Sequence, residues 1–141
     1  MATRKLGFAE LVKAVIARLN ADALTSGYDN YGYVPPTATF PYNVIGGPIG
    51  VRSPSFGSRD TEAESNAIHV HTWSDYQGDK EVTQMQDNIV QAMTGTALSI
   101  TGYTAPFQVL LDYADVLDDD TDPNERLKHG IIRFRVEMAP S

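Results

Sequence analysis

Apolar and polar residues follow two different periods along the chain, and these periods predict helices and strands in a definite order. Apolar residues recur every three or four positions over residues 6–21 and 79–94, the spacing of one face of an α-helix. Four other segments have the pattern of strands. In most of them apolar residues alternate with polar ones, and one begins near a proline, which is tolerated at the start of a strand. The predicted strands are residues 40–47, 62–72, 107–116 and 126–138.

This order predicts an α+β fold with a roughly four-stranded, mainly antiparallel sheet and two helices on one face. The 141 residues contain no repeat and no linker, so we expect a single domain over 1–141. Residues 28–39 are predicted to be irregular. Residues 48–60 are rich in Gly, Pro, Ser and Arg, and they are predicted to form a long, exposed hairpin arm.

Composition narrows the possible functions. The chain has no cysteine, which excludes disulfides, thiolate metal sites and cysteine nucleophiles. Its net charge of −7 repels phosphate backbones and disfavours nucleic-acid binding. No stretch approaches about 18 uncharged apolar residues, and the basic N-terminus runs into a charged helix. We therefore expect a soluble, intracellular protein with no membrane segment and no signal peptide.

Two clusters invite a metal hypothesis. His69 and His71 are two residues apart in a predicted strand, so both rings project from the same face and could share a divalent ion with a third ligand. The sequence does not place His129, the only other histidine, near them. The contiguous aspartates of 118–122 lack the central glycine of a calcium loop and precede Pro123, which favours a hairpin tip. We predict no metal site.

The sequence contains carboxylates that could act in acid–base catalysis, but their spacing does not predict a catalytic site. Glu62, Glu64, Asp75 and Asp79 offer carboxylate pairs, yet no spacing sets any two of them across a substrate. No serine lies in a strand-to-helix nucleophile turn, and no glycine-rich phosphate loop is present. We expect no enzymatic activity, no catalytic residues and no cofactor.

The predicted arm is one candidate interaction site. Within the arm, Arg52 and Arg59 flank Phe56, so Phe56 could anchor in a partner while the arginines pair with the partner's carboxylates. The alternative is that these charges only keep an exposed loop soluble.

The sheet face without helices is a second candidate. Alternation places His69, His71 and Trp73 on one face of their strand, and Arg133 and Arg135 face outward from the last strand. If these faces coincide, the surface is mixed polar and aromatic, and such faces pack against another subunit. The alternative for Trp73 is a plug at the sheet–helix junction.

The ordered set of elements resembles the tail-terminator or tail-completion family of long-tailed bacteriophages, neck proteins that close the top of a tail tube. The resemblance includes the N-terminal amphipathic helix and the helix from Asp79. The matching strands are Phe40–Gly46, Ile68–Ser74 and Gly130–Val136. Segments 96–106 and 117–125 are longer than in the family pattern.

The resemblance implies a structural virion protein located in the tail or neck and assembled in the host cytoplasm. It implies a homo-oligomeric, hexameric ring that ends tail polymerisation, with the tail tube protein and a head-side connector as partners. An acidic lumen would let DNA pass without binding, because carboxylates repel phosphates. Two alternatives stay open: a small acidic partner-binding module, and a metal-dependent enzyme using His69 and His71.

Overall fold

The computed structural model shows an α+β fold, as predicted, with two helices and five strands. It describes residues 8–52, 64–76, 78–95, 97–100, 109–122 and 125–138. The elements are α1 (Phe8–Ala21), β1 (Asp29–Tyr31), β2 (Tyr42–Arg52), β3 (Glu64–Ser74), α2 (Lys80–Thr94), β4 (Val109–Asp122) and β5 (Glu125–Met138).

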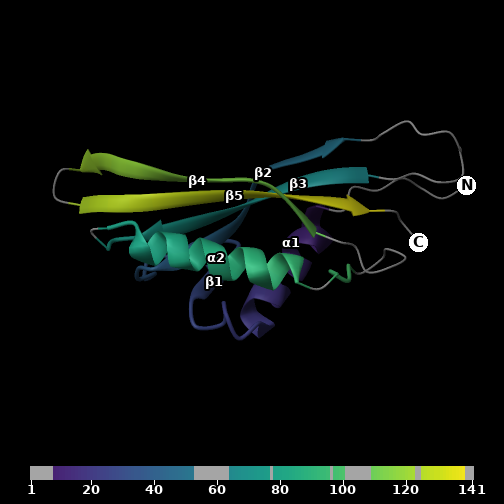
Figure 1. Ribbon diagram of the computed structural model, residues 1–141, viewed down its shortest axis with the longest axis horizontal. Helices are drawn as coiled ribbons and strands as arrows, with labels where there is room; N and C mark the ends of the chain where they lie inside the picture. Colours follow the sequence, from purple (N-terminus) through teal and green to yellow (C-terminus); the bar gives the residue numbers. More distant parts are fainter. Residues whose placement is uncertain are drawn as a thin grey trace, which may run out of the picture.

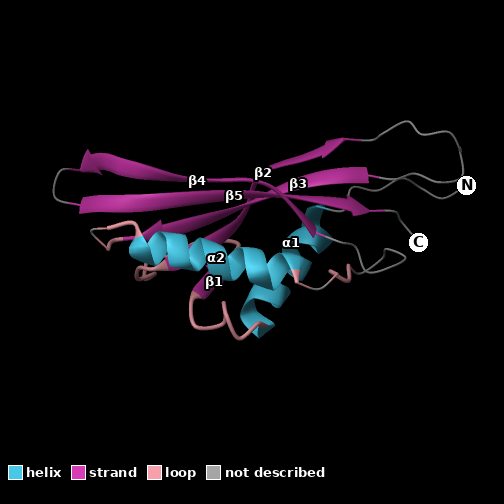
Figure 2. Cartoon of the chain, in the orientation of Figure 1, coloured by secondary structure: helices cyan, strands magenta, loops and turns pink. Residues whose placement is uncertain are grey.

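The strands form one sheet in the order β1-β2-β3-β5-β4. Strand β1 is parallel to β2, and the other pairs are antiparallel. Both helices lie against the same face of the sheet (Figure 1), which leaves the opposite face without a helix (Figure 2). We call that opposite face the open face.

Two strands are longer than predicted, and one was not predicted. Strand β2 continues to Arg52, into the segment predicted to be the arm, and the rest of that segment, with Phe56 and Arg59, lies outside the described residues. Strand β4 continues to Asp122, so most of the predicted acidic turn is paired strand. Strand β1 lies in the segment predicted to be irregular. It was not predicted because its three polar residues show no alternation of apolar and polar positions.

The core lies between the helices and the sheet. Both predicted helical stripes are confirmed, since their central residues are fully buried. Helix α1 packs against β1, β2 and α2, and helix α2 packs against β3, β4 and β5. Each fully buried side chain contributes about 1.5–3 kcal/mol relative to an exposed one. The fully buried residues of these elements include Leu11, Val15, Leu19, Met85, Ile89, Met93, Ile68, Val70, Ile132, Phe134 and Val136.

At Gly130, β5 passes close to α2. A Cβ atom at Gly130 would lie 2.6 Å from Gln86 Nε2 and 3.0 Å from Val82 Cγ2. The Gln86 amide donates to the backbone oxygen of Asp115 at 2.9 Å, so it cannot move aside without losing that bond. The close approach of helix and sheet therefore requires glycine here.

We predict that Gly130→Ala lowers the free energy of unfolding by about 1–3 kcal/mol, the usual cost of overpacking. Urea denaturation followed by circular dichroism measures this loss. Gly27→Ala is the matched control, because nothing lies within 4 Å of a Cβ placed there. Equal losses in both variants would show that the contact with α2 is not the cause.

Candidate functional site

The open face brings together the residues predicted for it. His69, His71 and Trp73 alternate with fully buried residues of β3 and therefore point away from the helices. In the β3–β5 register, His69 lies opposite Arg133, and Arg135 follows two residues later on the same face of β5. Two strands far apart in the sequence thus place all five side chains on one face of the sheet, where His69 is only 7% exposed.

His129 completes this surface, and the sequence analysis did not place it. Its ring stacks on Trp73 with ring centroids 3.9 Å apart and planes 9° apart. Its Nε2 lies 2.8 Å from His71 Nδ1, a hydrogen bond whose donor depends on the tautomers. His69 Nε2 in turn lies 3.5 Å from the Tyr113 hydroxyl. We call Trp73, His129, His71, His69 and Tyr113 the aromatic row.

A β-bulge brings Tyr113 and Asp112 to the open face. The β4–β5 register shifts between Leu111 and Tyr113, so β4 has one extra residue there. Simple alternation along β4, which places Val109, Leu111 and Tyr113 on one face, is therefore wrong beyond the bulge. Tyr113 pairs instead with Arg133.

Asp112 lies between the two arginines. Its Oδ2 is 3.0 Å from Arg133 Nε and 3.5 Å from Arg135 Nη2. All three side chains are about one third exposed, so each pair contributes only about 0.2–1 kcal/mol. The main effect of the carboxylate is to hold both guanidinium groups in place beside the aromatic row.

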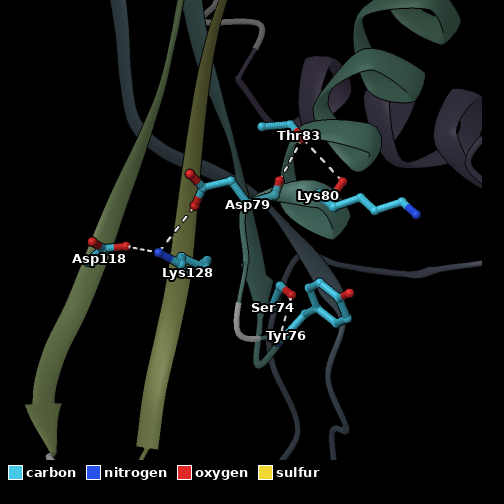
Figure 3. Close-up of polar contacts among 7 residues, drawn as sticks. All are labelled: Ser74, Tyr76, Asp79, Lys80, Thr83, Asp118 and Lys128. Atoms are coloured by element: carbon cyan, nitrogen blue, oxygen red, sulfur yellow. Dashed lines mark hydrogen bonds and ion pairs between the residues drawn. The ribbon is translucent and has the colours of Figure 1, made fainter.

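The turn after Trp73 has a structural role. Ser74 is buried, and its hydroxyl donates to Glu81 Oε1 at 2.6 Å. The same hydroxyl accepts the Tyr76 backbone N–H at 3.1 Å (Figure 3). At the start of α2, the Thr83 hydroxyl donates to the Asp79 backbone oxygen at 2.6 Å. The hydrogen bonds of Ser74 thus fix the turn that joins β3 to α2.

Lys128 ties this junction to the β4–β5 hairpin. Its ammonium group forms ion pairs with Asp118 on β4 and, at 3.2 Å, with Asp79 Oδ1 before α2 (Figure 3). The hydrogen bond with Asp118, and then that with Asp79, raises the pKa of Lys128 above its ordinary value. Asp79 is thus held in an ion pair.

The raised pKa gives Lys128 a pH-dependent part in stability. Its contribution is fully present below the unfolded-state pKa of about 10.4 and is lost as the pH rises through the higher folded-state pKa. We predict that Lys128→Met lowers the urea midpoint at pH 8 and that the difference from wild type disappears at more alkaline pH. Lys13→Met is the control, because Lys13 is 74% exposed. A difference that persists unchanged at high pH would contradict the ion-pair account.

The residues considered for metal binding and acid–base catalysis form no such site in the described part of the chain. Within that part of the chain, no three His, Asp or Glu side chains come together in a metal-binding group. Of the four acids considered for catalysis, Glu62 lies outside the described residues, whereas Asp75 is exposed. No helix in the described ranges is long and apolar enough to cross a membrane.

Comparison with known proteins decides the family. The family described as "Tail completion protein gp17" matches residues 10–139. The chain belongs to this tail completion protein family. A search of curated proteins finds no match.

A solved structure supports the fold. A chain described as "Virion of native gene transfer agent (GTA) particle" superposes with a TM-score of 0.76, covering 96% of this chain and 99% of that one. At 18% sequence identity this similarity concerns the fold. The resemblance seen in the sequence is thus confirmed by the family match: the protein is a structural component of the virion tail or neck.

Proposed function

We propose that this protein forms a ring of six copies that caps the tail tube, ends tube polymerisation and presents the surface to which the head-side connector binds. The observation that supports this most strongly is the family match, which extends over residues 10–139. The ring needs no catalytic step, so binding surfaces alone carry the function.

The open face is the docking surface in this proposal. Aromatic and arginine side chains are the types enriched at binding hot spots, and here they lie side by side on paired strands. Asp112 holds both guanidinium groups before a partner arrives, which reduces the entropy lost on binding. The second contact is the arm, where Arg52, Phe56 and Arg59 bind the tail tube protein.

The acidic end of the β4–β5 hairpin lines the DNA passage. Five acids lie between residues 118 and 125, and one of them, Asp118, is paired with Lys128. Such a wall repels phosphates and lets DNA move without binding. Because the open face carries Arg133 and Arg135, we place that face against protein.

The test combines light scattering with tube elongation. Purified protein is measured over a concentration series with and without a chelator, and it is also added to tubes that are growing from purified tail tube protein. We expect a chelator-insensitive ring near six copies, formed alone or on tubes, and tubes that stop growing.

Two outcomes would overturn the proposal. A strict monomer that neither assembles on tubes nor stops their growth would favour the partner-binding module. A species that dissociates with chelator would favour a metal held by His69 and His71.

A further inference from the structure

Exposed apolar side chains concentrate on one edge of the sheet. Strand β4 is the last strand at that edge. It carries four of the seven large hydrophobic residues that are exposed in the described part of the chain, each 45–46% exposed. These four residues are Leu110, Leu111, Tyr113 and Leu117.

The edge of β4 is open to a further strand. Over its 14 residues β4 pairs with β5 on one side, and no described strand pairs with it on the other. An open edge of this length offers a row of backbone donors and acceptors. Folded proteins protect such edges with charged residues, proline or β-bulges; β4 contains no lysine and no proline, and it is protected only by its aspartates and the bulge at Asp112.

The charges of the two sheet edges indicate which strand can pair with β4. Strand β4 contains six aspartates and no basic residue, so two β4 strands from different copies would place like charges side by side. The opposite edge of the sheet differs. Strand β1 pairs only with Tyr42–Val44, so β2 from Ile45 to Arg52 has no described partner on that side. That segment contains no acid and ends in Arg52.

We propose that the β4 edge of one copy binds the free part of the β2 edge of a second copy. This inference rests on the proposed ring and assigns the contact that closes it. Two different surfaces that meet head to tail generate a closed ring when the rotation between copies fits. Pro48 has no N–H group, so the donors on this edge come from other residues of the segment.

Cysteine cross-linking tests the contact directly, because the wild-type chain has no cysteine. The double variant Leu111→Cys/Val51→Cys places one thiol on each edge and is treated with a short bis-maleimide. We expect a ladder of covalent oligomers up to the ring size on a denaturing gel. Each single variant should stay monomeric on the gel, as should the control Lys80→Cys/Val51→Cys.

A charge variant tests the same edge without cross-linking. Leu111→Lys/Leu117→Lys changes two exposed positions, so the melting temperature should not fall. We expect the concentration for half-assembly to rise at least tenfold, measured by light scattering with and without tubes. The control Leu24→Lys/Tyr33→Lys changes two exposed apolar residues elsewhere and should assemble as the wild type does.

The outcomes separate this inference from the proposed function. Rings that form without a ladder, or a charge variant that assembles at wild-type concentrations, overturn the edge contact and leave the ring intact. Dimers from Leu111→Cys alone would show that β4 pairs with itself. A wild-type chain that stays monomeric both alone and on tubes overturns the ring and the edge contact together.

Discussion

Phe134→Asp is expected to leave the chain unfolded. Phe134 is fully buried on β5, between Ile68 on β3 and Leu111 on β4. Losing the aromatic side chain costs about 3–5 kcal/mol, and burying an unpaired carboxylate costs several more. The total stability of a domain is only about 5–15 kcal/mol. Far-UV circular dichroism and the yield of soluble protein measure the result.

Phe134→Leu is the control for this prediction. It keeps an apolar side chain of similar shape at the same position, so we expect a folded protein with a lower melting temperature. A folded and soluble Phe134→Asp variant would show that residue 134 faces the open side, and the faces assigned to β5 would then be inverted.

Arg133→Glu/Arg135→Glu is expected to reduce tail joining about 100-fold or more, which corresponds to roughly 3 kcal/mol of binding free energy. The change removes both partners of Asp112 and gives the open face three neighbouring carboxylates. A docking partner selected for arginines would meet charges of the wrong sign. Sedimentation with purified tubes and the titre of joined particles measure the loss.

A control must separate the effect of the changed net charge from the effect of where the changed residues lie. Lys13→Glu/Lys80→Glu makes the same change in net charge on the two helices, away from the open face, and should join tails normally. Melting temperatures of both variants check that the fold is retained. Normal joining by the arginine variant would exclude the open face as the docking surface, and an equal loss in the lysine control would indicate a general charge effect.

The sequence predicts the elements whose pattern is long and regular. Apolar spacing recovers both helices, and alternation gives the correct faces of β3 and β5. It fails where one residue breaks the period: the bulge at Asp112 turns Tyr113 to the other face, because strand side chains alternate with a period of two. It also misses β1, which is set by pairing with β2 rather than by its own composition.

The open face likewise has features that a local sequence pattern predicts and features that it does not. Alternation in β5 already puts His129 on the face that carries Arg133, so its side was predictable. Its stack with Trp73 was not, because that contact depends on the β3–β5 register, which no local pattern specifies. The ion pair between Lys128 and Asp79 is likewise a product of register and helix position.

The stack of Trp73 on His129 also gives the protein an intrinsic optical probe. Trp73 is the only tryptophan in the chain, so all indole emission comes from one position on the open face. A partner that covers this surface changes the polarity around the indole ring. Docking on the open face can therefore be followed in unlabelled protein by fluorescence, whereas contacts made only through the β4 edge should leave the emission unchanged.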